Sequence, residues 1–137
     1  MKSITLPRTG MTPIRFTGEI LSHVSGRDLP KCESRQRWHE LTLYRTDSDR
    51  FILHAAFRAE TRYETDNDQV RVFDTLFLAA QWLWQWHATR NCLAAVQGWQ
   101  LERHRERDAA LRRDLLNQMS SLITKLVEQV PQAAEVV

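Results

Sequence analysis

Residues 38–61 read WHELTLYRTDSDRFILHAAFRAET, a pattern that predicts a β-hairpin and decides the fold. Two runs of strand-forming residues flank residues 47–49 (Asp-Ser-Asp), which favour a short turn. With the turn centred on the serine, Leu43 faces Leu53 on one side of the hairpin. Apolar residues alternate with more polar ones along the second run, so a one-residue slip would move that whole face into water. The register is therefore well specified.

Two further strands are predicted beside the hairpin, and together they give a four-stranded antiparallel meander. Apolar residues alternate from Ile14 to Val24, where Gly18 suggests a bulge and Leu21 breaks the alternation. After a second turn, residues 70–73 (Val-Arg-Val-Phe) predict a short fourth strand. In the expected register two valines of this strand oppose the end of the hairpin: Val70 and Val72 opposite Thr61 and Ala59.

The second half of the chain is predicted to be helical. Asp74 and Thr75 are good helix N-caps ahead of residues 76–88, which are apolar nearly all round. Such a helix must be covered on more than one side, so we expect it to lie between the sheet and a later helix. The alternative is a fifth strand, because three tryptophans alternate within it. One or two further helices are expected between position 91 and Pro131.

These elements define one α+β domain, an antiparallel four-stranded β-meander followed by two or three C-terminal helices. Residues 1–13 show no periodicity and predict a flexible N-terminal lead. Residues 14–130 form the domain, with the meander in 14–73 and the helical part in 75–130, and residues 131–137 form a C-terminal tail. A chain of 137 residues, 42% of them hydrophobic, can bury a core without disulfides or metals.

Composition argues against several classes of protein. Nineteen Lys and Arg residues against seventeen Asp and Glu residues give a net charge of +2, too small for a protein that coats DNA or an anionic membrane. No apolar run approaches the ~20 residues of a membrane span, and no secretory signal follows the start. Cys32 and Cys92 lie far apart and suggest reduced thiols. We expect a cytoplasmic protein that does not contact membranes.

No arrangement of residues indicates a catalytic centre, a metal site or a cofactor. The His and Cys spacings do not match a zinc site, and His39 lies on the core face of the hairpin, where an interior hydrogen-bonded histidine is expected. Glu64, Asp66 and Asp68 are spaced like the start of a calcium loop, but Gln69 and Thr75 replace its glycine and its final glutamate. We therefore expect a protein that is not an enzyme.

The other face of the hairpin is the candidate surface for binding a partner protein. The register places Trp38 opposite Arg58, where a guanidinium can lie over an indole. Aromatic and arginine side chains dominate the energetics of protein interfaces. The candidate partner-binding residues are Trp38, Tyr44, His54 and Arg58. The alternative is that a C-terminal helix covers this face.

A weak basic patch is a candidate for nucleic-acid contacts. Residues 27–45 carry a local charge of +2, with five basic side chains against three acidic ones. This is less than a phosphate-binding surface normally carries, so we expect nucleic-acid binding to be weak. The basic residues are Arg27, Lys31, Arg35, Arg37 and Arg45.

An apolar stripe near the C-terminus predicts self-association. Its members follow the 3, 4, 3, 4 spacing of a short coiled-coil seam, which indicates a homodimer or a docking helix. The alternative is a core helix that packs on the protein's own sheet. The seam consists of Leu116, Met119, Ile123, Leu126 and Val130.

The hairpin sequence WHELTLYRT (residues 38–46) followed by Arg50 and Phe51 resembles that of small bacterial proteins, some carried on mobile elements. This resemblance favours a bacterial or phage accessory protein and implies no activity. The leading hypothesis is a small protein-interaction module, an inhibitor or regulator from a mobile element; anti-CRISPR proteins share this size and lack of motifs. The first alternative is a nucleic-acid-binding regulator that uses the arginine-rich loop with the Trp38 and Tyr44 face, and the second is an enzyme of unfamiliar type.

Overall fold

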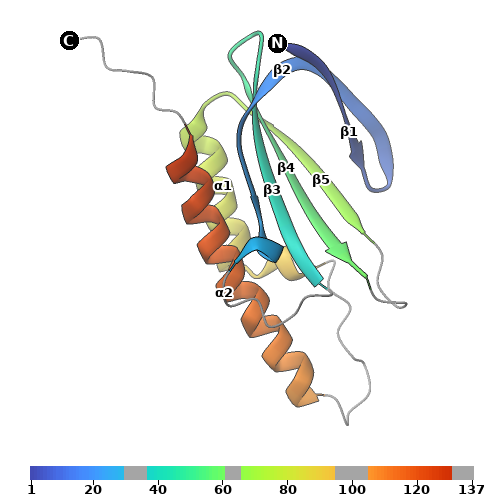
Figure 1. Ribbon diagram of the computed structural model, residues 1–137, viewed down its shortest axis with the longest axis vertical. Helices are drawn as coiled ribbons and strands as arrows, with labels where there is room; N and C mark the ends of the chain where they lie inside the picture. Colours follow the sequence, from blue (N-terminus) through green and yellow to red (C-terminus); the bar gives the residue numbers. More distant parts are fainter. Residues whose placement is uncertain (30–36, 61–65, 95–104, 131–137) are drawn as a thin grey trace, which may run out of the picture.

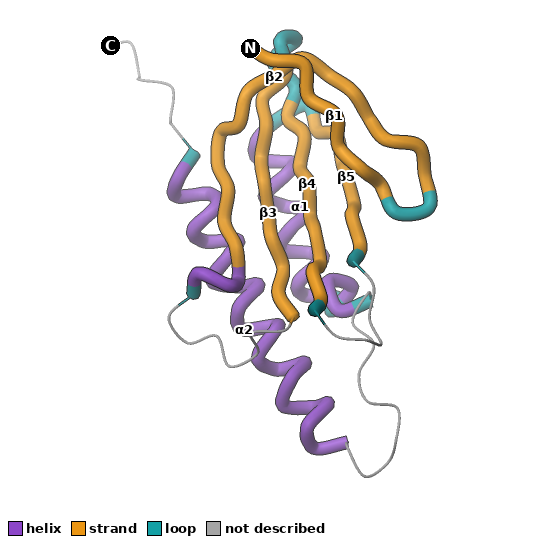
Figure 2. The backbone as a smooth tube through the Cα atoms, turned by 45° about the vertical axis from the view of Figure 1, so that its right-hand side comes forward, coloured by secondary structure: helices purple, strands orange, loops and turns teal. Residues whose placement is uncertain are grey.

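The computed structural model describes residues 1–29, 37–60, 66–94 and 105–130, and it shows one antiparallel sheet with two α-helices on one face (Figures 1 and 2). Its five strands are hydrogen-bonded in the order β1-β2-β3-β4-β5. The predicted α+β class is confirmed, but the sheet has five strands rather than four. The elements are β1 (Lys2–Arg8), β2 (Met11–Ser25), η1 (Gly26–Asp28), β3 (Arg37–Thr46), β4 (Phe51–Ala59), β5 (Asn67–Phe73), α1 (Leu76–Ala88), η2 (Asn91–Leu93) and α2 (Arg105–Gln129).

The hairpin of β3 and β4 has the register that its sequence predicts. Leu43 pairs with Leu53, and Trp38 pairs with Arg58. Its turn is closed by Thr46, whose backbone N–H donates to the Arg50 carbonyl at 2.8 Å. Asp49 adopts a positive φ of 58°, a conformation that aspartate tolerates better than most residues.

The predicted flexible lead is wrong, because residues 2–8 form the edge strand β1. Ile4 pairs with Phe16 and Leu6 pairs with Ile14, which shows that the apolar alternation of β2 has a partner upstream. The strands are joined by a tight turn in which Gly10 has a φ of +75°, a value that glycine adopts without strain. The glycine and prolines that suggest an irregular segment therefore mark a hairpin turn and an edge strand.

A bulge in β2 makes this strand change faces. The pairing with β3 shifts between Ile20 and Ser22, so the irregularity lies at Leu21 rather than at the predicted Gly18. Before the shift, even-numbered positions point away from the helices, and after it they point toward them, because the extra residue reverses the alternation. Gly18 has a different role, since a Cβ atom there would lie 2.5 Å from the Arg45 carbonyl oxygen.

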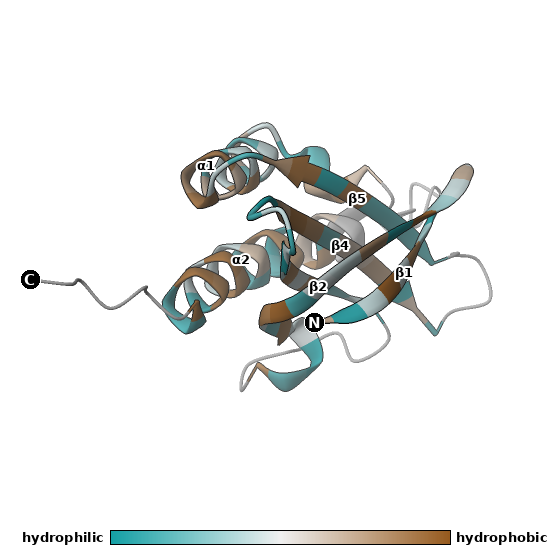
Figure 3. Ribbon diagram, turned by 90° about the horizontal axis from the view of Figure 1, so that it is seen from above, coloured by the Kyte–Doolittle hydropathy of each residue, from teal (hydrophilic) through white to brown (hydrophobic). Residues whose placement is uncertain are grey.

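The hairpin of β1 and β2 folds over the sheet on the side away from the helices (Figure 3). Its tip is fastened to β5 by Thr9, whose N–H donates to the Asp68 carbonyl at 2.9 Å and whose Oγ1 accepts from the Asp68 N–H at 2.7 Å. The sheet thus curls into a half-barrel. We call its inner side the barrel face, which buries a small core of Leu6, Tyr44 and Ile52.

The main core lies on the opposite side of the sheet, which we call the helix face. Leu41, Leu43 and Leu53 of the sheet pack against α1 and α2. The predicted dimer seam on α2 lies in this core: Met119 and Ile123 are 0% exposed, Leu126 is 1% exposed and Val130 is buried, while Leu116 is partly buried beside them. The seam therefore contacts the protein's own sheet, and the assignment of these side chains to self-association is wrong.

The strand β5 pairs with residues 51–57 of β4 rather than with its C-terminal end. Val70 lies opposite His54 and Val72 lies opposite Ile52. The predicted pairing of these valines with residues 59 and 61 is therefore wrong, and position 61 lies outside the described residues. The observed register brings Arg71 and Gln69 to the helix face, next to α1.

The prediction of a helix at residues 76–88 is confirmed. Thr75 caps α1, since its Oγ1 accepts a hydrogen bond from the Leu78 N–H at 3.2 Å. The imidazole of His87, at the end of α1, lies 3.0 Å from the Leu116 carbonyl oxygen in the middle of α2. Among the residues described, no helix combines the length and the apolar character that crossing a membrane requires.

Candidate functional site

The predicted partner-binding residues lie on the barrel face, and the two aromatic ones are buried. Trp38 and Tyr44 are each only 7% exposed. The ring of Tyr44 meets Phe16 edge-on at 5.3 Å, so the N-terminal hairpin covers it, and not a C-terminal helix. Trp38 and Arg58 are paired in the register, but the cation over the Trp38 ring is Arg27, at 4.4 Å. The expected contact between Trp38 and Arg58 is therefore wrong.

Arg58 and His54 belong instead to an ion-pair network around Asp68. Arg58 donates two hydrogen bonds to the Asp68 carboxylate, at 3.0 and 2.8 Å, and His54 Nε2 lies 2.7 Å from Asp68 Oδ1. Burial disfavours the Asp68 carboxylate, but the hydrogen bonds from Arg58 and His54 outweigh this and lower its pKa below the usual value. Asp66 and Glu40 lie further out, at 3.7 and 3.8 Å from Arg58. This network ties β4 to β5, next to the contact between β5 and Thr9.

His39 and Cys92 form a buried contact in the main core. His39 Nε2 lies 2.9 Å from the Cys92 carbonyl oxygen, which confirms the expected interior hydrogen-bonded histidine. Burial lowers the pKa of His39 to about 4 and raises the pKa of the Cys92 thiol to about 11. At neutral pH the imidazole is therefore uncharged and the thiol is protonated. Within the described part of the chain, no cluster of three or more His, Cys, Asp and Glu side chains could hold a metal ion.

The predicted basic patch does not form a free cationic surface in the described residues. Arg27 pairs with Glu60 at 3.0 Å and Arg45 pairs with Glu19 at 2.6 Å. Arg37 is buried, and Lys31 and Arg35 lie outside the described residues. Each paired arginine brings a carboxylate with it, which weakens attraction to phosphate.

We therefore expect weak binding of nucleic acid, with no submicromolar affinity for a DNA or RNA oligonucleotide in ~150 mM salt. The measurement is fluorescence anisotropy of labelled single- and double-stranded oligonucleotides over a range of salt concentrations. Each phosphate that is truly neutralised would make log K fall by ~0.7–0.9 per unit of log salt. A steep slope together with tight binding would contradict this expectation.

The outer side of α1 carries the most exposed aromatic residues of the helical layer. Phe77 is 72% exposed and Trp84 is 41% exposed. They lie on one face with Gln81 and Ala88, because these positions are spaced 4, 3 and 4 residues apart. We call this set the α1 stripe. No residue of α1 is an Asp, Glu, Lys or Arg. The helix contacts both the sheet and α2, in line with the expected cover on more than one side, while the described residues leave the α1 stripe exposed.

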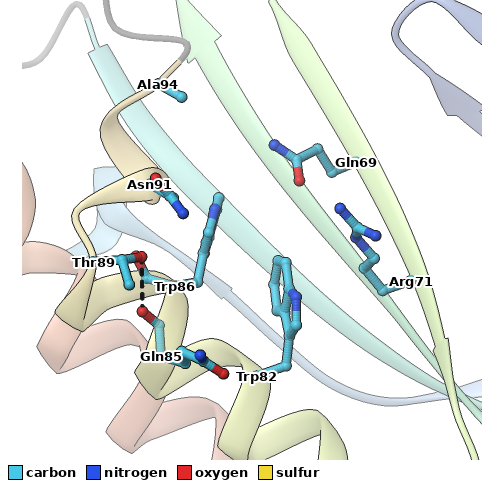
Figure 4. A pocket seen from close by; sticks show the side chains of 8 residues that line it. All are labelled: Gln69, Arg71, Trp82, Gln85, Trp86, Thr89, Asn91 and Ala94. Carbon is cyan, nitrogen blue, oxygen red and sulfur yellow. Dashed lines mark hydrogen bonds between the residues drawn. The ribbon is translucent and has the colours of Figure 1, made fainter.

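A pocket opens between α1 and β5, on the side of α1 next to the stripe (Figure 4). Its volume is about 390 Å³. Trp82 and Trp86 form one wall and are stacked, with ring centroids 5.1 Å apart and an angle of 22° between the rings. The guanidinium of Arg71 lies 5.5 Å from the centre of the Trp82 ring. The remaining lining residues are Gln69, Gln85, Thr89, Asn91 and Ala94.

The sequence predicts neither the α1 stripe nor this pocket as a site. The absence of a polar face on α1 is visible in the sequence, but full burial explains it equally well. The pocket joins residues of β5, α1 and η2, and no fixed spacing links them. The chain matches no known family model, no curated protein and no solved structure.

Proposed function

We propose that this protein is a non-enzymatic protein-interaction module that binds a partner protein through the α1 stripe. The observation that carries the proposal is the exposure of Phe77 and Trp84 on a helix that has no charged residue at all. Isolated apolar residues are normal on a surface, but an uncharged aromatic stripe is typical of an interaction site. Tryptophan is among the residues that most often dominate binding energy at interfaces.

The chemistry of the stripe defines the partner surface that would fit it. Gln81 and Ala88 lie between and beside the two aromatic rings, so the stripe offers apolar area and one amide but no charge. The centre of the partner surface should therefore be apolar and uncharged, because a charged group would lose its water without gaining an ion pair. Leu78, 42% exposed, widens the apolar surface on the side of the helix near β5.

The finer proposal is an inhibitor or regulator that works by occupying a surface of its target in the cytoplasm. Its small size and its lack of catalytic motifs suit stoichiometric binding rather than turnover. The resemblance of residues 38–46 to proteins of mobile elements supports an origin in a bacterium or phage, and an anti-CRISPR-like role is one example of this class. A homodimer through the same stripe is an outcome that the experiment below distinguishes.

The partner is identified by photocrosslinking in the native host. The photoreactive residue p-benzoylphenylalanine is placed at position 77 or 84, and as a control at position 20, since Ile20 is 61% exposed but lies on β2. We expect the same crosslinked species from both α1 positions and not from the control. A product of twice the 16.1 kDa chain mass would identify a second copy as the partner. Identical products from all three positions would contradict the proposal.

Phe77→Ser combined with Trp84→Ser should weaken binding to the purified partner at least tenfold, whereas Ile20→Ser should not. The reason is that large exposed rings at the centre of an interface contribute ~2 kcal/mol or more each when the partner buries them. The melting temperature should change by only a few degrees in either variant, because these side chains lie outside the core. Binding is measured by calorimetry and unfolding by circular dichroism. Unchanged affinity in the double variant would refute a role for the stripe.

A further inference from the structure

The pocket between β5 and α1 gathers several polar side chains around one hollow (Figure 4). Gln69 and Arg71 come from β5, Gln85 comes from α1, and Asn91 comes from η2. Among the described residues, none of these four side chains makes a hydrogen bond or an ion pair. Three of them, Arg71, Gln85 and Asn91, are exposed, so all four side chains are available to a molecule that enters the hollow.

Trp86 adds an indole N–H donor that remains open to the pocket. It is only 8% exposed, and its indole N–H makes no hydrogen bond within the part of the chain that the structure describes. In Figure 4 the indole nitrogen points toward the space between Asn91 and Gln69. Because this N–H faces the hollow, an acceptor on a bound molecule can take its hydrogen bond.

The charge of the lining favours an anion. Among the described lining residues there is no carboxylate, while Arg71 contributes a guanidinium that is paired with none of the described acidic residues. An adjoining hollow of about 470 Å³, which shares Asn91 and Ala94 with the pocket, carries Arg90 and Arg113. A planar guanidinium binds carboxylate or phosphate through two parallel hydrogen bonds.

The shape of the pocket favours a flat ring. The two indoles stack face to face and are seen nearly edge-on in the pocket (Figure 4), and an aromatic ring can pack against such edges in a T-shaped arrangement. A volume of about 390 Å³ lies at the small end of ligand sites, which admits one ring system with its substituents. Amide side chains such as Gln69 and Asn91 can donate and accept at the edge of such a ring.

We propose that this pocket binds a small molecule made of a planar aromatic ring and an anionic group, about the size of a nucleoside monophosphate. The ring packs against the edges of the two indoles, the anion binds Arg71, and polar atoms of the ring meet the amides and the Trp86 N–H. This site goes beyond the proposed function, because it uses the side of α1 that faces β5 and not the α1 stripe.

The test is a titration followed by NMR, with four probes: adenosine 5′-monophosphate, indole-3-carboxylate, adenosine and inorganic phosphate. The readout is the indole N–H signals of Trp82 and Trp86, with those of Trp38 and Trp84 as internal controls because neither residue lines the pocket. We expect at least one of the two anionic aromatic probes to bind with a dissociation constant below about 1 mM. That probe should bind at least tenfold more tightly than adenosine and phosphate. Which of the two anionic probes binds more tightly shows whether the ligand is a nucleotide or an aromatic carboxylate.

Two variants make the result specific to the pocket. Arg71→Gln should weaken binding of the anionic probe at least tenfold and leave binding of adenosine unchanged. Arg15 is an exposed arginine on β2, and Arg15→Gln should change neither affinity. Equal binding of adenosine 5′-monophosphate and adenosine would overturn the role of Arg71. Each probe is also added at 10 mM, a concentration on the order of the weakest useful dissociation constant. If no probe then shifts the signals of Trp82 and Trp86, the site itself is refuted.

Discussion

Ile123→Asp is expected to leave the protein unfolded at room temperature. Ile123 is 0% exposed and lies in the main core between α2 and the sheet. An aspartate there loses a large apolar side chain and must either bury a charge or be protonated, which together cost more than ~4 kcal/mol. A loss of this size compares with the lower end of the free energy of unfolding of a typical domain, ~5–15 kcal/mol. Circular dichroism and a urea titration measure the loss.

Thr124→Asp is the matched control for this change. Thr124 is the next residue of α2, and its side chain is exposed, so the same charge should cost little there. A folded Ile123→Asp variant that had merely changed from dimer to monomer would show that the stripe on α2 is a seam between two chains. The structure predicts the opposite, because every member of that seam is fully or partly buried within one chain.

Acid should destabilise the protein between about pH 6.5 and 4, because His39 cannot accept a proton while it is buried. Burial lowers the pKa of His39 from 6.5 to about 4 in the folded state, whereas the unfolded chain keeps the ordinary value. In this window the unfolded state binds a proton that the folded state does not, so stability falls as the pH falls. A shift of this size corresponds to a loss of about 3 kcal/mol once the pH is below both values. Urea titrations at a series of pH values measure the slope.

His39→Gln should remove most of this slope. The glutamine amide can still donate to the Cys92 carbonyl, which His39 Nε2 contacts at 2.9 Å, but it does not titrate. Asp68 does not affect the comparison of His39→Gln with the unchanged protein. Because the pKa of Asp68 is lowered in the folded state, the stability that its carboxylate contributes is lost only when the pH falls below the ordinary pKa of 3.8. A variant whose stability still falls as steeply as that of the unchanged protein between pH 6.5 and 4.5 would contradict this assignment.

Local features of the fold could be predicted from the sequence, and long-range ones could not. The register of β3 and β4 follows from alternation and from one short turn, and the start of α1 follows from the cap at Thr75. The strand β1 was missed because its two apolar positions are few and its turn glycine resembles that of an irregular loop. The bulge at Leu21 was visible only as a break in the pattern, since nothing in the sequence tells which face a strand takes after such a break.

Residues proposed as sites were misplaced for a related reason. Periodicity shows that a helix has an apolar stripe, but it does not show whether the stripe meets its own sheet or another molecule, as Ile123 illustrates. The sequence predicts Tyr44 on a free surface because it does not predict β1, and β1 and β2 together form the hairpin that covers Tyr44. The pocket could not be predicted at all, because Arg71 and Trp82 meet only after β5 and α1 have packed together.

The contact between Thr9 and Asp68 also bears on the tendency of the protein to aggregate. The strands β1 and β5 are the two edges of the sheet, and an open edge offers unpaired N–H and C=O groups to the edge of another molecule. Because the sheet curls, these two edges meet at Thr9. Their backbone groups hydrogen-bond to each other there instead of to a strand of another molecule. Pro7 reinforces the protection, since it removes one N–H donor from β1. A β-rich protein of this size therefore limits edge-to-edge association by its own curvature.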